Sequence, residues 1–212
     1  AMLMIVMIFA QLERETIQQR VIDAYSSRSK RGFYMGGKVP YGFRLKETVI
    51  DGIRTKMYEP IPEEAEIVQT MFRMYAEPQT SFGDIVRYLD EQQVKKRDGE
   101  PFSRSRIRDV VVNPVYVRAN ADVYAYYKRA GAILHNGVEE FDGIHGLTIY
   151  GRRQGKTKSK FRDLTGENIQ LNRHEGFISA DDWLRVQYRL GENKALKNSG
   201  SGTHSWISGL VK

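Results

Sequence analysis

The N-terminal segment is the feature that most limits what this chain can fold into. Residues 2–25 contain neither proline nor glycine, and Ile5, Ile8 and Leu12 recur near one face at helical spacing. The first third of the segment is apolar on nearly all sides, whereas the part from Gln11 onward is amphipathic and charged. We therefore predict a long N-terminal helix that must bury its beginning against another domain or self-associate through it.

A second, shorter helix is bounded at both ends. Ser103 is a good N-cap because its hydroxyl can accept from an amide of the first turn, and Pro114 disfavours the helical region for the residue before it. At about 100° per residue, three apolar side chains share one face: Ile107, Val110 and Val111. The polar residues of the opposite side are Ser105, Arg108 and Asp109, with Arg106 flanking them.

The order of charges in this short helix is unusual. Arg104 and Arg106 lie in its first turn, where the helix dipole is positive and disfavours cations. One interpretation is a solvated charged face. The other is a helix that meets an external anion, for which DNA phosphates and guanine edges are the obvious candidates.

Basic residues elsewhere are banded. Lys and Arg outnumber Asp and Glu by 33 to 26, a net charge of +7 that permits nucleic-acid binding without proving it. Residues 24–46 hold six basic residues and no acidic one: Arg28, Lys30, Arg31, Lys38, Arg44 and Lys46. Residues 143–162 hold six more, again with no acidic one: Arg152, Arg153, Lys156, Lys158, Lys160 and Arg162.

Residues 26–42 predict a basic loop, punctuated by glycines and carrying aromatic residues such as Tyr41. A loop of this composition has little to fold around by itself. It could be ordered by lying along a DNA backbone or in a minor groove, or it could be a plain interdomain linker.

Turn and capping signals divide the next part of the chain into short elements. Segments 41–45 and 55–59, joined across Asp51-Gly52, predict a hairpin, and helices are expected to begin near Pro62 and after the N-cap Ser81. The apolar stripes expected in these two helices are Ile67, Met71, Met74 and Tyr75, and Phe82, Ile85, Val86 and Leu89.

Beyond Pro114, we expect a helix over residues 121–130 and then short strands and basic loops over 133–171. A last amphipathic helix follows the N-cap Ser179, with Trp183, Val186 and Leu190 on its buried face. The predicted fold class is α+β: a long N-terminal helix and then a mixed, mainly helical domain with short antiparallel strands.

Several function classes lack their sequence signals. The chain has no cysteine, and its four histidines are not paired at metal-ligand spacing, so we expect neither a disulfide nor a metal or other cofactor. The apolar run 3–10 is too short to span a membrane and lacks the flanks of a signal peptide. Neither a nucleophile motif nor a phosphate-binding loop motif is present, so the residues indicate a binding module without a small-molecule substrate.

Five segments in order resemble the large serine recombinases, the phage-type integrases and transposon resolvases of bacteria. They are Phe-Ala-Gln-Leu-Glu-Arg-Glu at 9–15, Gly-Gly-Lys-Val-Pro-Tyr-Gly-Phe at 36–43, the stretch from Ile107 to Asn-Pro-Val-Tyr at 113–116, His-Glu-Gly-Phe-Ile-Ser at 174–179 and Trp-Ile-Ser-Gly-Leu-Val-Lys at 206–212. Each segment alone is a weak signal, but the five occur in the right order and are spread across nearly the whole chain.

The resemblance implies three parts. Residues 1–27 would be a linker helix leaving a catalytic domain that lies outside this chain, 28–195 the recombinase DNA-binding domain with its basic N-terminal loop, and 196–212 a linker and the start of a zinc ribbon. Zinc would be held only by that further ribbon. The resemblance also implies a protein of the bacterial cytoplasm, associated with the nucleoid, that binds double-stranded DNA and positions the catalytic domain at its attachment site without itself cleaving DNA.

On this hypothesis Ser105, Arg106 and Arg108 would face the major groove and Arg104 would contact phosphate. The full set of residues predicted to contact DNA is Arg28, Lys30, Arg31, Lys38, Tyr41, Arg44, Ser103, Arg104, Ser105, Arg106, Arg108, Arg152, Arg153 and Lys156. Two alternatives remain open: a protein-interaction module that docks on an acidic partner domain, and a helix-turn-helix transcription regulator, whose usual turn is shorter than the one here.

Overall fold

The computed structural model describes residues 2–150 and 164–197. Helix α1 (Met2–Lys30) continues five residues past Tyr25, so Arg28 and Lys30 lie in its last turn and not in the expected loop. The helix can continue because the first helix-breaking residue is Gly32, which has a φ of +74°, and because cations at a helix C-terminus are favoured by the dipole. The loop therefore begins after the helix.

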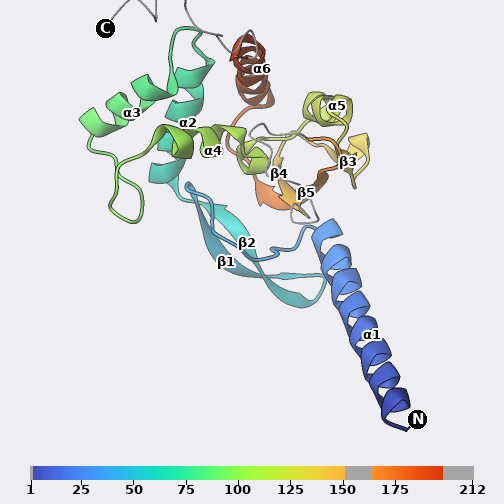
Figure 1. The fold of residues 1–212 in the computed structure, drawn as a ribbon. Helices are drawn as coiled ribbons and strands as arrows, with labels where there is room; N and C mark the ends of the chain where they lie inside the picture. Colours follow the sequence, from blue (N-terminus) through green and yellow to red (C-terminus); the bar gives the residue numbers. More distant parts are fainter. Residues whose placement is uncertain (1, 151–163, 198–212) are drawn as a thin grey trace, which may run out of the picture. The chain divides into compact units, whose positions relative to one another are not determined.

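The described chain forms two compact units, and the first comprises Ala1–Gln69 and Asn113–Ala180. Its strands β1 (Phe43–Ile50) and β2 (Ile53–Pro60) form the expected antiparallel hairpin (Figure 1). The turn residues Asp51 and Gly52 have φ values of 50° and 76°, the combination that a tight two-residue hairpin turn requires. The two strands are longer than the segments 41–45 and 55–59 that the sequence predicted.

The first unit also holds a three-stranded sheet in the order β3-β5-β4. The strands are β3 (Ile133–Leu134), β4 (His145–Tyr150) and β5 (Asn168–Glu175). The pair β4–β5 is antiparallel and the two-residue β3 joins β5 in parallel, so the α+β class and its short antiparallel strands are confirmed, with one parallel pairing in addition. The helical segments of this unit after the hairpin are η1 (Pro114–Tyr116), α5 (Ala121–Arg129) and η2 (Val138–Glu140).

An aromatic cluster around Phe43, which is fully buried, forms the core of the first unit. The Phe43 ring lies between 5.1 and 5.7 Å from four other rings, measured between centroids: Tyr58, Tyr116, His174 and Phe177. The Tyr116 hydroxyl donates to the carbonyl oxygen of Tyr41 at 2.8 Å. The cluster therefore joins the hairpin to η1 and to the end of β5.

His174 is the polar member of this cluster and is 2% exposed. Its Nε2 lies 2.7 Å from the carbonyl oxygen of Val115. Since a carbonyl oxygen can only accept, Nε2 carries a proton. Burial lowers the pKa of His174 to about 4, against which the hydrogen bond to Val115 acts in the opposite direction.

Two glycines let backbones approach closely within this core. A Cβ on Gly176 would lie 2.2 Å from the carbonyl oxygen of Val117, so no side chain fits there. Gly42 has a φ of +95°, and its amide donates to Glu64 Oε2 at 2.7 Å. These positions need glycine for space in one case and for conformation in the other.

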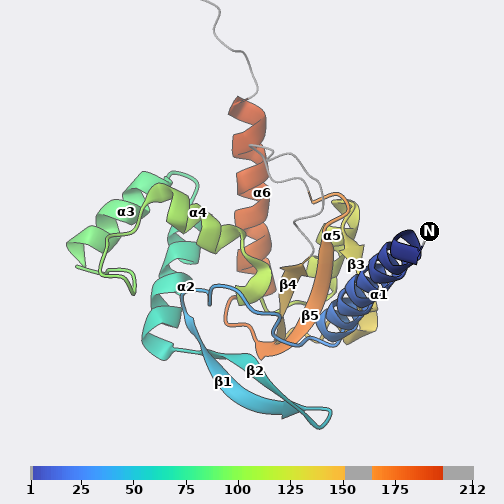
Figure 2. The same ribbon diagram turned by 60° about the horizontal axis from the view of Figure 1, so that its bottom comes forward.

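The second unit comprises Thr70–Val112 and Asp181–Lys212. It holds the end of α2 (Pro62–Ala76), together with α3 (Phe82–Glu91), α4 (Arg104–Val112) and nearly all of α6 (Ala180–Lys197), of which α3 and α4 pack side by side (Figures 1 and 2). In α2 the expected Met71 and Tyr75 are buried, and so are Val68 and Phe72, which the expected stripe omitted. In α3 and α6 the expected core residues Ile85, Leu89, Trp183 and Val186 are at most 1% exposed.

Arg189 of α6 closes the end of α2. Its guanidinium donates to the carbonyl oxygens of Tyr75, Pro78 and Thr80, the latter two at 2.7 and 2.8 Å. The same group lies 4.4 Å from the centre of the Tyr75 ring, which stacks on Phe82. One arginine thus satisfies a carbonyl group in the last turn of α2 and two carbonyl groups of the loop that follows it.

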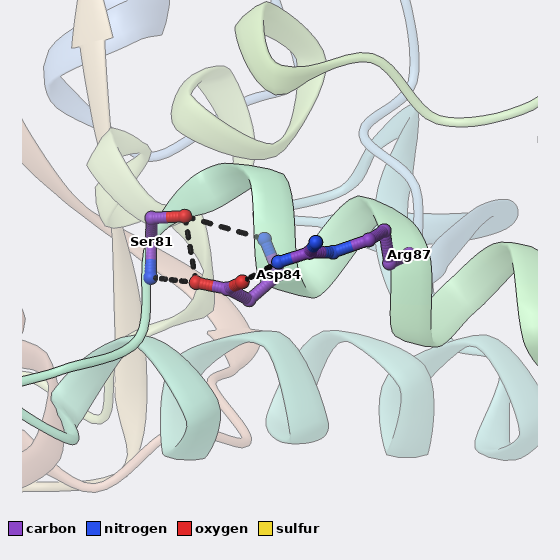
Figure 3. A network of polar contacts seen from close by, with 3 residues as sticks. All are labelled: Ser81, Asp84 and Arg87. Atoms are coloured by element: carbon purple, nitrogen blue, oxygen red, sulfur yellow. Dashed lines mark hydrogen bonds and ion pairs between the residues drawn. The ribbon is translucent and has the colours of Figure 1, made fainter.

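Helix α3 begins with a reciprocal cap, as its sequence predicts (Figure 3). The Ser81 hydroxyl accepts from the Asp84 amide at 3.3 Å, while Asp84 Oδ2 accepts from the Ser81 amide at 2.7 Å. The hydroxyl and amide of Ser81 and the guanidinium of Arg87 together lower the pKa of Asp84 to about 2. The start of α3 is therefore fixed by local hydrogen bonds in addition to the stacking of Phe82 on Tyr75.

Helix α4 has the predicted start and orientation. The Ser103 hydroxyl accepts from the Arg106 amide at 3.2 Å, and Gln187 of α6 donates to the Val111 carbonyl oxygen at 2.8 Å. The apolar residues Ile107, Val110 and Val111 are 0–3% exposed. Ser103 fixes where the helix begins, and the apolar face fixes which side faces the core.

The first unit should lose stability as pH falls from about 6.5 to about 4. The unfolded chain binds a proton at His174 below the ordinary pKa of 6.5, whereas the folded chain does not until about pH 4, so this one group should cost roughly 3 kcal/mol across that interval. Urea unfolding between pH 4 and pH 7.5 measures the change. His174→Gln keeps an amide donor but cannot titrate, and its pH dependence should be flatter; curves parallel to the wild type would contradict the assignment.

Loss of the α4 cap should destabilise the second unit selectively. Ser103→Ala removes the side-chain acceptor for the Arg106 amide and should lower the free energy of unfolding by about 1 kcal/mol. Ser105→Ala, two residues on and exposed, is the matched control and should be neutral or slightly stabilising. Urea denaturation followed by circular dichroism compares the two; equal losses would mean that Ser103 does not cap the helix.

Candidate nucleic-acid interface

The outward face of α4 carries the residues predicted to face the major groove of DNA. Ser105 and Arg108 are exposed on the side opposite the buried apolar residues, half-buried Arg106 flanks them, and Arg104 is exposed but lies nearer the apolar side. Two turns of helix thus present two guanidinium groups and a hydroxyl outward, the side-chain types that pair with guanine edges and phosphates. The arrangement is the one that the helical spacing predicted.

Arg104 differs from the other two arginines. A Cβ built on Gly83 of α3 would lie 3.1 to 3.4 Å from the Arg104 guanidinium atoms, so this side chain lies over the first turn of α3. Its charge is placed beside the α3 cap formed by Ser81 and Asp84. Arg104 therefore belongs to the α3–α4 contact, and Arg106 and Arg108 carry the outward charge of α4.

A small hairpin between α3 and α4 adds three cations that the predicted set omitted, Lys95, Lys96 and Arg97. Lys95 pairs with Pro101 in an antiparallel bridge, and the Lys96 amide donates to the Glu100 carbonyl oxygen at 2.9 Å. The signal for it was present in the sequence, as a cation run followed by Asp98-Gly99. This hairpin explains why the connection is longer than a usual helix-turn-helix turn.

In the first unit, Arg28 and Arg31 meet at Phe33. Their guanidinium carbons lie 5.4 and 5.1 Å from the centre of the Phe33 ring, which is 3% exposed. Arg31 also forms an ion pair of 2.6 Å with Asp51 at the hairpin turn, and Arg173 lies 3.6 Å from the same carboxylate. The Arg31 hydrogen bond lowers the pKa of Asp51, so the carboxylate stays charged.

Arg44 and Lys46 share a carboxylate on the hairpin. They lie 2.6 and 2.8 Å from the two oxygens of Glu59, and these contacts lower its pKa. The hydrogen bond from Lys46 contributes most to that shift, yet Lys46 was absent from the predicted set, although its alternation with Arg44 on one strand face was visible in the sequence. Two cations on one anion leave this face with net positive charge.

Lys38 and Tyr41 end up in different environments. Lys38 is exposed, next to Gly36 and Gly37, whose φ values are +87° and +102°. Tyr41 is 7% exposed and lies in the core, because its segment turns inward where Gly42 allows the chain to approach α2. Tyr41 is therefore a core residue and is left out of the proposed contact set, which corrects the sequence-based choice.

The predicted residues are thus divided between the units. Ser103 to Arg108 lie in the second unit, and Arg28, Lys30, Arg31, Lys38 and Arg44 lie exposed in the first. Arg152, Arg153 and Lys156 fall outside the described residues. Within residues 2–150 and 164–197 there is no group of three or more potential metal ligands, and no helix there is long and apolar enough to cross a membrane.

Comparisons with known proteins identify the fold and the family of the chain. No curated protein matches the chain. A crystal structure described as an LSR–DNA complex matches it with a TM-score of 0.50 and 15% sequence identity, which indicates a shared fold. The match covers 89% of this chain and 44% of the other, so the chain spans less than half the length of that protein.

The sequence model of the Recombinase family matches residues 62–193, from the start of α2 into α6. The match includes α3, the small hairpin and α4, and it ends within the last helix. It covers more than half of the chain. The chain therefore belongs to the Recombinase family, as the resemblance of its five segments to large serine recombinases predicted.

Proposed function

We propose that this chain binds double-stranded DNA with sequence preference, as the DNA-binding part of a serine site-specific recombinase. The observation that carries the proposal is the outward face of α4, where Ser105, Arg106 and Arg108 stand opposite a fully buried apolar face. A short helix held from behind by its core and by Gln187 can enter a major groove without distortion. Family membership and the likeness to a recombinase bound to DNA support the same function.

The two kinds of basic surface suit two kinds of contact. On α4 the guanidinium groups project from a rigid helix, which favours bidentate recognition of guanine. In the first unit, Lys38 lies on a glycine-containing loop, and Arg44 and Lys46 both contact the Glu59 carboxylate. Cations placed in this way favour contact with phosphates without sequence selection. We propose that α4 selects the site and that the first unit adds affinity.

We further propose that strand cleavage belongs to another part of the recombinase. The sequence of this chain contains no recognised nucleophile motif, and the solved recombinase that it resembles is more than twice as long as the matched region. On this proposal the chain recognises the recombination site and does not cleave it. Incubation with supercoiled plasmid should produce no nicked product, and nicking that a serine-directed inhibitor abolishes would contradict it.

Replacement of one arginine should separate site selection from general affinity. Arg108→Ala should weaken binding to the cognate site by roughly 1–3 kcal/mol and leave binding to random duplex nearly unchanged. Lys38→Ala should weaken binding to both alike and reduce the salt slope by about one unit. Fluorescence anisotropy across a salt series, with a site first selected from random duplexes, measures both.

If both variants lose affinity equally for selected and random duplexes, the division of roles is wrong. If the wild type shows no salt-dependent binding to any duplex, DNA binding itself fails. The interaction-module alternative would then be favoured, because a basic surface without affinity for phosphates would have to serve a protein partner.

Self-association through α1 is a second proposal that a specific observation favours. Apolar side chains of this helix are largely exposed: Met7 by 71%, Phe9 by 67%, Leu12 by 53%, Ile17 by 53% and Val21 by 64%. Residues of this kind at such exposure usually mark an interface. The exposed residues follow directly on the apolar beginning of the helix, so a second copy could cover both.

The apparent mass should therefore rise with protein concentration. Replacing Phe9 and Leu12 together by glutamate should place charges in the interface and keep the protein monomeric. Gln18→Glu, which adds one negative charge to the same helix without removing an apolar side chain, should leave association unchanged. Sedimentation equilibrium measures all three proteins, and a wild type that stays monomeric at high concentration would overturn the proposal.

A further inference from the structure

A cavity of about 510 Å³ lies in the first unit, where the end of α1 and the loop after it cover the sheet. Its walls come from α1 at Tyr25 and Ser29, from the loop 33–37, from Tyr58 of β2, and from strands β4 and β5. This volume is in the range of about 300–1,000 Å³ that small-molecule sites occupy. None of the predicted DNA-contacting side chains lines it.

The lining is aromatic and uncharged. Five rings contribute to it, those of Tyr25, Phe33, Tyr34, Tyr58 and Tyr150. The rings of Tyr34 and Tyr58 meet edge to face at 5.5 Å, and burial raises the pKa of Tyr58 to about 12, so that its hydroxyl stays neutral. None of the described residues that line the cavity carries a charge, so its walls suit a flat, neutral group that can stack.

Two of the lining residues hold buried polar atoms that lack a hydrogen-bond partner. They are the Tyr150 hydroxyl and Oε1 of Gln170, a residue that is 3% exposed. Burial raises the pKa of Tyr150, and the nearby Ser29 hydroxyl, which donates to the Ser26 carbonyl oxygen at 2.9 Å, acts against that rise. Unpaired buried groups are costly and rare, and a ligand with both a donor and an acceptor edge would satisfy them by turning these two side chains toward the cavity.

Three cations neighbour residues that line the cavity. Arg28 and Arg31 stack on Phe33, one of the lining rings, and Lys38 follows directly on the lining residue Gly37. A neutral aromatic interior with cations beside it matches the two halves of a nucleotide, an uncharged base and an anionic phosphate. Aromatic side chains interleaved with cations are the usual platform for unpaired bases.

We propose that this cavity binds the base of a nucleotide, with the phosphate held beside it by Arg28 or Lys38, since Arg31 is already paired with Asp51. The nucleotide could be free or could be a base that has left the stack of bound DNA. The second source rests on the proposed DNA-binding function, whereas the first does not. Either source would supply the donor and acceptor that Tyr150 and Gln170 lack.

The two sources can be measured separately with the whole chain. Isothermal titration with dAMP and dTMP, and with inorganic phosphate as the reference, tests the free nucleotide. Anisotropy with two labelled duplexes tests DNA, one fully paired and one with a single abasic position that leaves the opposite base unpaired. The unpaired base should improve affinity by about tenfold or more, because the cost of unstacking is already met.

Tyr34→Ala should lower the affinity for the duplex with the unpaired base, or for dAMP, by about tenfold, which is the scale of one lost stacking contact. Tyr188→Ala, in the second unit, is the matched control and should change neither. Tyr150→Phe keeps the ring and removes the hydroxyl. It should raise the urea midpoint of the protein without nucleotide and weaken nucleotide binding, a combination that a merely structural tyrosine would not give.

If dAMP binds and the duplex with the unpaired base is not preferred, the cavity binds a free nucleotide. If that duplex is preferred and dAMP does not bind, the cavity binds a base of DNA. No binding of mononucleotides together with equal affinity for both duplexes overturns the proposal, as do unchanged affinities in Tyr34→Ala and Tyr150→Phe. Salt-dependent binding to the paired duplex would persist in that case, so the proposed function would stand. If the chain binds dAMP but shows no salt-dependent binding to the paired duplex, the proposed DNA-binding function is wrong and the nucleotide site stands.

Discussion

The packing of Phe43 against four other rings is the constraint on which the first unit depends. Tyr58, Tyr116, His174 and Phe177 come from segments far apart in the chain, and the cluster can close only where Gly42 and Gly176 bring backbones together. Three of the five segments that resemble the large serine recombinases supply all of these residues except Tyr58. The resemblance therefore rests largely on the residues that build the core, which explains how it identifies the family without identifying the DNA contacts.

The second unit solves a different problem, which is to hold a short helix with a highly charged face. Helix α4 is too short to be stable by itself in water. Its start is fixed by Ser103, its apolar face is buried, and Gln187 binds one of its last carbonyl groups. Arg189 holds the end of α2 in the same unit. With the helix secured from the inner side, Arg106 and Arg108 are not needed for folding and remain available for an external anion.

The basic residues look alike in the sequence but differ in the fold. Arg31 is paired with Asp51, Arg44 shares Glu59 with Lys46, and Arg104 lies over Gly83. Exposed ion pairs of this kind contribute little to stability, but they hold a long side chain in one orientation. Charge density alone therefore overstated the number of equivalent phosphate contacts, because a cation that faces a carboxylate presents less net charge to DNA.

The sequence by itself determined the elements whose signals are local. Caps at Ser81 and Ser103, the turn at Asp51-Gly52 and the helical period of residues 104–112 depend on neighbours a few positions away, and the structure confirms each. Only the tertiary structure decided what depends on distant residues: the burial of Tyr41 and His174, the partners of Arg31 and Arg44, and the cavity beside Tyr150. The physical reason is that caps, turns and helical periods depend on residues close together in the sequence, whereas burial and charge pairing arise only when distant segments come into contact.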